Sequence, residues 1–172
     1  YHLVDVHSRD LAAAPVALME ACQARLGDRV SPEFLRSQIE IGTGVCRQFA
    51  AARSEIAELR REVIHLSAKH GLAPIAAGTH PFGRWSALTH TPKERYEMLA
   101  RDLAAVGRRL VISGMHVHVA IEDPELRIDI MNQVRYFLPH LLMLSTSSPF
   151  WEGHDTGLKS YRLAVSQESP RT

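Results

Sequence analysis

Apolar residues recur at helical spacing in three stretches of the chain. In 15–26 they lie three to four positions apart, and Gly27 follows as a natural helix C-cap. A longer stretch, 46–70, carries an apolar stripe. A third, 125–144, contains Pro139, which predicts a kink or a restart of the helix. The stripe of the second predicted helix consists of Phe49, Ile56, Leu59, Val63 and Leu66.

Shorter apolar runs predict strands at 1–6, 38–45, 72–77 and 110–121. The last contains Ser113-Gly114, which is compatible with a bulge. No glycine-rich phosphate loop follows any of these strands, because neither Gly-x-Gly-x-x-Gly nor a Walker A sequence occurs.

Two further regions have clear local signals. Thr91-Pro92-Lys93-Glu94 is typical of a capped helix start, and the pattern predicts a helix that continues to Arg109. From Ser145 onward the chain is rich in Ser, Gly and Pro, which favours loops.

Size and composition limit the possible functions. A chain of 172 residues with 45% hydrophobic residues predicts one globular domain, 1–172. The formal net charge of +1 argues against bulk attraction to nucleic acid or to an anionic membrane. No apolar run reaches membrane-spanning length.

Cysteine usage points to a reducing compartment. Cys22 and Cys46 lack CxxC spacing, so a disulfide framework is not expected and the cytoplasm is the simplest location. Either residue could be a reactive thiol or, as is more common, a small buried apolar residue.

Carboxylates near residue 40 are candidates for metal binding. In a strand, Gln38 and Glu40 share one face and Ile39 and Ile41 the other. A carboxylate on a rigid strand suits a hard cation such as Mg²⁺. The alternative is an exposed glutamate on a half-solvated strand.

Two histidines form the second candidate group. His116 and His118 alternate with Val117, so they would share a strand face. With a third ligand such as His80 they could bind Zn²⁺, or they could hydrogen-bond phosphates or carboxylates. Histidines without a function remain the alternative.

Other polar residues lie in loops and on a helix. Thr79 and His80 follow a predicted strand, where they could belong to a binding site or to a structural turn. Arg135 lies on a predicted helix, three residues after Asn132, and could either face a binding site or lie on a solvated face. Arg162 follows a glycine-rich loop, and its guanidinium fork could bind a carboxylate or a phosphate.

Five segments together resemble the type 2 glutamate–cysteine ligase family of carboxylate–amine ligases. They are 31–44 (SPEFLRSQIEIGTG), 78–82 (GTHPF), 114–118 (GMHVH), 144–151 (LSTSSPFW) and 155–162 (DTGLKSYR). Enzymes of this family join an acid to an amine with ATP. The resemblance implies ATP and Mg²⁺ as cofactors, and glutamate with cysteine or another amine as substrates.

The resemblance also implies a fold and roles for particular residues. The fold would be α+β and glutamine-synthetase-like, with a mainly antiparallel curved sheet and helices packed on one face. Glu40, His116 and, more loosely aligned, Glu33 would hold nucleotide-bound Mg²⁺, with no zinc. Arg162 would contact the acidic substrate, and the residues assigned more generally to nucleotide or substrate binding are Gln38, Thr79, His80, His118 and Arg135.

Only about half of the usual family length is covered. Family members carry an acidic Gly-x-Glu-x-Glu strand immediately before the position of Tyr1, and a further acidic and arginine-bearing strand beyond residue 172. We therefore expect a partial catalytic domain that is inactive alone, with exposed strand edges that favour a homo-oligomer. A His-x-His metal hydrolase and a non-catalytic ligand-binding fragment are the alternatives.

Overall fold

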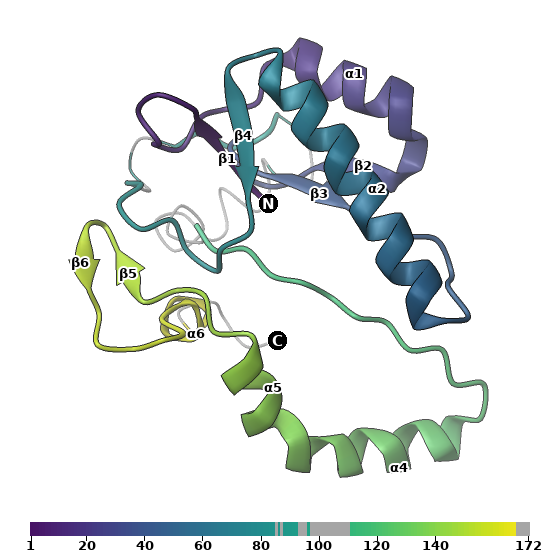
Figure 1. Cartoon of the computed structure of the whole chain (residues 1–172). Coiled ribbons are helices and arrows are strands. Elements are labelled where there is room, and N and C mark those ends of the chain that lie inside the picture. Colours follow the sequence, from purple (N-terminus) through teal and green to yellow (C-terminus); the bar gives the residue numbers. More distant parts are fainter. Residues whose placement is uncertain (85, 87, 93–95, 97–110, 168–172) are drawn as a thin grey trace.

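The structure is a computed structural model that describes residues 1–84, 86, 88–92, 96 and 111–167 (Figure 1). Most of the helix predicted from Thr91 to Arg109 lies outside the described residues. The strands are β1 (His2–Asp5), β2 (Val30–Pro32), β3 (Ile39–Ile41), β4 (Leu72–Ile75), β5 (Phe150–Trp151) and β6 (His154–Asp155). The helices are α1 (Val16–Leu26), η1 (Gly27–Arg29), α2 (Phe49–Ala68), α4 (Pro124–Val134), η3 (Arg135–Phe137), α5 (Leu138–Leu144) and α6 (Arg162–Ser166).

All three strand ladders are short and antiparallel. They join β1 to β4, β2 to β3, and β5 to β6. β1 also bonds to the residues that lead into β3: the Tyr1 and Ile39 backbones exchange hydrogen bonds of 2.9 and 3.0 Å, and Leu3 N donates to Ser37 O at 2.8 Å. The strands near β1 therefore follow the order β4, β1, β3, β2. This mixture of helices and small antiparallel sheets agrees with the α+β prediction.

Helices α1 and α2 cover one face of these strands (Figure 1). The apolar core between them is built from residues at the predicted helical and strand spacing. Of the predicted stripe, Leu59 and Val63 are buried, but Phe49 is 95% exposed because α2 begins there, beyond the strands. The buried residues of this core are Leu3, Ala14, Leu18, Cys22, Val30, Ile39, Val63 and Leu72.

The opposite face of β1 is also buried and carries both His2 and the apolar Val4. Because Leu3 and Ile39 point into the helical core, their neighbours His2 and Gln38 point the other way. Gln38 Nε2 donates to Ile112 O at 2.8 Å and lies 3.4 Å from His2 Nδ1. Gln38 thus joins the β3 side of the sheet to the segment that begins at residue 111.

The strand predicted at 110–121 is not formed as predicted in the described part, 111–121. Ile112 makes one isolated antiparallel bridge with Thr79, and Ser113 N donates to Gly78 O at 2.9 Å. Beyond this point the segment runs as an extended trace towards α4 (Figure 1), with Met115 81% and Val117 74% exposed. No described strand pairs with 113–121, so the alternating pattern lacks the ladder bonds that a strand requires.

The strand predicted at 38–45 is also shorter, because only Ile39–Ile41 pairs with β2. After it, Glu55 of α2 holds the following loop: its carboxylate accepts from Gly44 N at 3.0 Å and pairs with Arg29 at 3.0 Å. The Glu55 carboxylate thus satisfies polar groups of the loop that would otherwise need the hydrogen bonds of a longer strand.

The helix predicted at 125–144 is confirmed with a break, because η3 separates α4 from α5 and Pro139 lies in the first turn of α5. Asp123 caps α4 by accepting from Glu125 N and Leu126 N. Neither α4 nor α5 buries a residue. The exposed large apolar side chains of α4, η3 and α5 include Leu126, Ile128, Met131, Phe137, Leu138, Leu141, Met143 and Leu144.

The remaining elements are local. The region after Ser145, predicted as loops, contains the β5–β6 hairpin and the short helix α6. Within the described ranges, none of the helices has the length and apolar character that crossing a bilayer requires.

Burial of His2 predicts a pH dependence of stability. Desolvation lowers the pKa of its imidazole from 6.5 to about 3 in the folded chain. Between pH 6.5 and about pH 3 the unfolded chain therefore binds one more proton than the folded chain. The contribution of His2 to the free energy of unfolding is complete above pH 6.5 and falls by about 1.4 kcal/mol per pH unit as the pH drops towards 3. His2→Asn should flatten this slope in urea titrations run from about pH 7 to about pH 4.

The matched control is His70→Asn, which replaces an exposed histidine just after α2. Equal slopes for the two variants would show that His2 does not set the acid sensitivity.

Candidate active site

Arg162 lies against two glycines that are far apart in the sequence. A Cβ atom added to Gly114 would lie 2.8 Å from Arg162 Nη2, and one added to Gly78 would lie 3.2 Å from Arg162 Cδ. The main chain of Arg162 is held at the start of α6, where its N–H donates to Ser148 Oγ at 3.1 Å. The side chain therefore extends from α6 across the segments 78–80 and 112–114.

The guanidinium of Arg162 carries a donor that has no partner among the described residues. Its Nε is buried without a hydrogen-bond partner, and the described part of the chain offers no carboxylate to pair with it. A buried donor on a charged group costs free energy unless an acceptor reaches it. An anionic ligand would satisfy this requirement.

His116 and His118 lie on one side of their segment, as predicted. Their ring centroids are 6.0 Å apart, and both side chains are exposed. In an extended chain, alternation places Gly114 on the same side as these two histidines. Arg162, which contacts the Gly114 position, therefore approaches the imidazole side of this segment.

Glu40 is exposed on β3, opposite Ser31 of β2. Its carboxylate accepts one hydrogen bond, from Ser31 Oγ at 3.3 Å, and the carboxylate of Glu33 accepts from Phe34 N at 2.7 Å. The negative charges of Glu33 and Glu40 both lie within electrostatic reach of the backbone nitrogen of Tyr1, next to the start of β1.

The polar atoms of three other predicted residues are engaged inside the chain. Thr79 Oγ1 donates to Phe150 O at 2.9 Å, and Gln38 joins Ile112 as described. His80 Nδ1 accepts from Gly83 N at 2.7 Å while its Nε2 lies 2.9 Å from Arg9 O. Because Nδ1 accepts, the ring proton belongs on Nε2, where it is donated to the carbonyl.

These contacts weaken the zinc alternative. His80, its candidate third ligand, has both ring nitrogens occupied. Across the ranges that the structure describes, no group of three or more His, Cys, Asp or Glu side chains is arranged to hold a metal ion. Glu33, Glu40 and His116 therefore do not form a complete metal site by themselves.

The other predicted candidates are peripheral. Arg135 is exposed at the start of η3, after the equally exposed Asn132.

Burial raises the pKa of the Cys22 thiol, and a hydrogen bond to Glu55 at 3.3 Å raises the pKa of the Cys46 thiol. A raised pKa disfavours the thiolate, so the structure favours the inert role for both cysteines.

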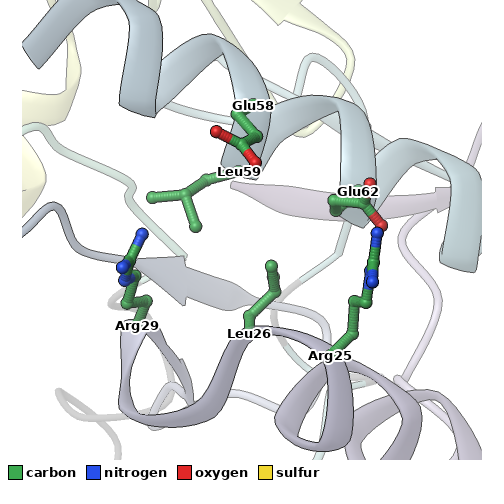
Figure 2. Close-up of a pocket in the computed structure, with 6 residues that line it drawn as sticks. All are labelled: Arg25, Leu26, Arg29, Glu58, Leu59 and Glu62. Carbon is green, nitrogen blue, oxygen red and sulfur yellow. The ribbon is translucent and has the colours of Figure 1, made fainter. Parts of the chain in front are cut away.

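A surface pocket of about 260 Å³ lies elsewhere, between α1, η1 and α2 (Figure 2). Three of its four charged lining residues are paired within the protein, because Arg25 bonds to Glu62 at 3.1 Å and Arg29 to Glu55 at 3.0 Å. It contains none of the predicted site residues. Its lining residues are Arg25, Leu26, Arg29, Glu58, Leu59 and Glu62.

Sequence reasoning missed the residues that place Arg162. Gly78, Gly114 and Ser148 all lie within the recognised segments, but their role depends on contacts across the fold. Only their presence beside the predicted His and Arg residues could have drawn attention to them.

Comparison with known proteins gives a consistent result. The sequence model described as "Glutamate-cysteine ligase family 2 (GCS2)" matches residues 1–172. A Rhodospirillum rubrum protein named "Putative glutamate--cysteine ligase 2" is 61% identical over 177 residues, covering 100% of this chain and 46% of that protein. Proteins of the same name from Jannaschia sp. and Roseiflexus castenholzii are 55% and 43% identical, again over the whole chain and over 46% and 45% of their own lengths.

The chain thus spans a little less than half the length of these curated relatives. The match nevertheless runs through every segment that contains the residues described above. The chain belongs to glutamate–cysteine ligase family 2, a family of ligase-like enzymes.

Proposed function

We propose that this chain is the partial catalytic domain of an ATP-dependent carboxylate–amine ligase with a glutamine-synthetase-like fold. The observation that carries the proposal is the guanidinium of Arg162, whose buried Nε has no partner among the described residues and which lies against Gly114, two residues before His116. A cation with an unpartnered donor close to a segment that bears two imidazoles is suited to a site that binds anionic substrates and phosphates.

The proposed reaction has two steps. An oxygen of the acid's carboxylate attacks the γ-phosphorus of ATP, and ADP leaves, so that an acyl phosphate forms. The amine nitrogen then attacks the acyl carbon, phosphate leaves, the nitrogen loses a proton and the amide bond is complete. This chemistry needs no protein nucleophile, since positioning and charge stabilisation supply most of the catalysis.

Arg162 is the proposed binding group for the acidic substrate, with glutamate as the acid and cysteine as the amine. Its fork can form two parallel hydrogen bonds with a carboxylate. These bonds would satisfy the Nε that is buried and unpartnered.

Glu40, Glu33 and His116 are the proposed ligands of nucleotide-bound Mg²⁺. Mg²⁺ usually takes one or two carboxylates and completes its shell with water and phosphate oxygens. The exposed Glu40 carboxylate, with a single hydroxyl partner, fits this requirement. The ion would neutralise charge on the transferring phosphoryl group.

Gln38, Thr79 and His80 would support the site from within. Since their polar atoms already bond to other parts of the chain, we propose that they position the neighbouring segments instead of contacting ligand directly. His118 would complete the polar floor beside His116, and Arg135 remains a candidate for nucleotide binding.

The register of β1 suggests how the metal site is completed. Tyr1 pairs with Ile39, so an acidic strand placed immediately before Tyr1 would continue antiparallel beside Glu40. We propose that the acidic strand typical of this family lies there in the complete protein, and that the chain alone does not turn over substrate.

Exposed apolar surface predicts that the 172-residue chain self-associates. Residues 114–119 are unpaired within the described ranges, and α4 and α5 expose nearly all their large apolar side chains. Light scattering over a concentration series should show growing oligomers. A monomer that persists at the highest concentration would contradict the proposed homo-oligomer.

Glu40→Gln in the complete protein should preserve the fold and reduce kcat on the order of 100-fold, because the amide keeps the shape but removes the charge that attracts Mg²⁺. Steady-state assays across a Mg²⁺ series would measure this loss. The control is Glu20→Gln, an exposed position on α1. Turnover close to that of the control would remove Glu40 from the metal site.

Arg162→Lys in the complete protein should raise the KM for the acid roughly 10- to 100-fold and leave the KM for ATP nearly unchanged. Lysine keeps the charge but loses the fork, and a charged hydrogen bond contributes about 1.5–3 kcal/mol. Arg53→Lys on the exposed side of α2 is the control. Equal changes in both constants would assign Arg162 to phosphate, and no change would make it a surface residue.

A further inference from the structure

The side of Gly114 on which a Cβ atom would lie faces Arg162. The three heavy atoms nearest to an added Cβ all belong to Arg162: Nη2 at 2.8 Å, Cζ at 3.4 Å and Nε at 4.0 Å. These are atoms of the guanidinium itself. The space left by the missing side chain is therefore filled by the group that we propose binds the acid.

The backbone does not require glycine at this position. The glycines with positive φ are Gly27, Gly71, Gly153 and Gly157, so Gly114 has a conformation that other residues can adopt. The missing side chain of Gly114 therefore makes room for the Arg162 guanidinium, and no turn requires it.

The base of the Arg162 side chain is held more firmly than its end. The main-chain N–H of Arg162 donates to Ser148 Oγ. A Cβ atom added to Gly78 would lie 3.2 Å from each of three atoms: Arg162 Cδ, Ser147 Oγ and Ser148 Cβ. Gly78 N also donates to Ser147 O at 3.1 Å. A methyl group at Gly114 would therefore displace the guanidinium while the start of the side chain stays in place.

We propose that Gly114 is a positioning residue: by lacking a side chain, it sets the position of the Arg162 guanidinium beside the extended segment that carries His116 and His118. This inference rests on the proposed function, since it gives the acid-binding arginine its location. A bidentate hydrogen bond depends on the direction of both N–H groups, so a small displacement weakens it.

The test uses the complete protein and Gly114→Ala. The KM for glutamate should rise on the order of 10-fold, with the KM for ATP and the midpoint of thermal unfolding close to those of the parent. Gly42→Ala is the matched control, because Gly42 has no heavy atom within 4 Å of an added Cβ and no positive φ. It should leave both Michaelis constants unchanged.

A double-mutant cycle separates this inference from the proposed function. In an Arg162→Lys background, Gly114→Ala should raise the KM for glutamate no further, because the displaced guanidinium is no longer present. If Arg162→Lys raises this KM but Gly114→Ala does not, the role of Gly114 is overturned while the proposed function stands.

Three other outcomes also contradict the inference. Additive effects in the double variant would mean that Gly114 acts through another contact. Unfolding of Gly114→Ala without rescue by Arg162→Lys would mean that the glycine is required by the backbone. If Arg162→Lys itself has no effect, the acid-binding role and the inference fail together.

Discussion

The structure depends on β1 being hydrogen-bonded along both edges. β4 pairs with one edge, and the residues that lead into β3 pair with the other. This arrangement buries both faces of β1, with Leu3 in the apolar core under α1 and α2 and His2 in the polar layer opposite. Since strand residues alternate between faces, one short strand separates the region that stabilises the fold from the region that carries polar chemistry.

The polar layer contains groups that a purely structural core would not keep. His2 Nε2 and Arg162 Nε are buried without partners among the described residues, whereas Gln38, Thr79 and His80 use their polar atoms to connect segments. Unpartnered buried polar atoms are costly and rare, so they indicate a ligand or an additional segment of protein. The connected residues hold the main-chain segments that bear Glu40, His116 and Arg162.

Local patterns predicted the helices well and the strands less well. The helices α1 and α2 follow from apolar spacing and from glycines at their ends, because a helix satisfies its own backbone groups. Residues 114–119 alternate as a strand should, yet they remain unpaired among the described residues. A strand forms only when another segment supplies its hydrogen bonds, and no local pattern specifies that partner.

The sequence by itself determined the family, through its recognisable segments, and the helices with their apolar faces, through the spacing of apolar residues. The resemblance to the family then named the candidate residues Glu40, His116 and Arg162. The shared side of His116 and His118 was also predictable, because alternation is a local property of an extended chain. Only the tertiary structure decided that both ring nitrogens of His80 are hydrogen-bonded, to the backbones of Arg9 and Gly83, and that Arg162 lies against Gly78 and Gly114. Those contacts join residues that are distant in the chain, and they depend on how separate segments pack.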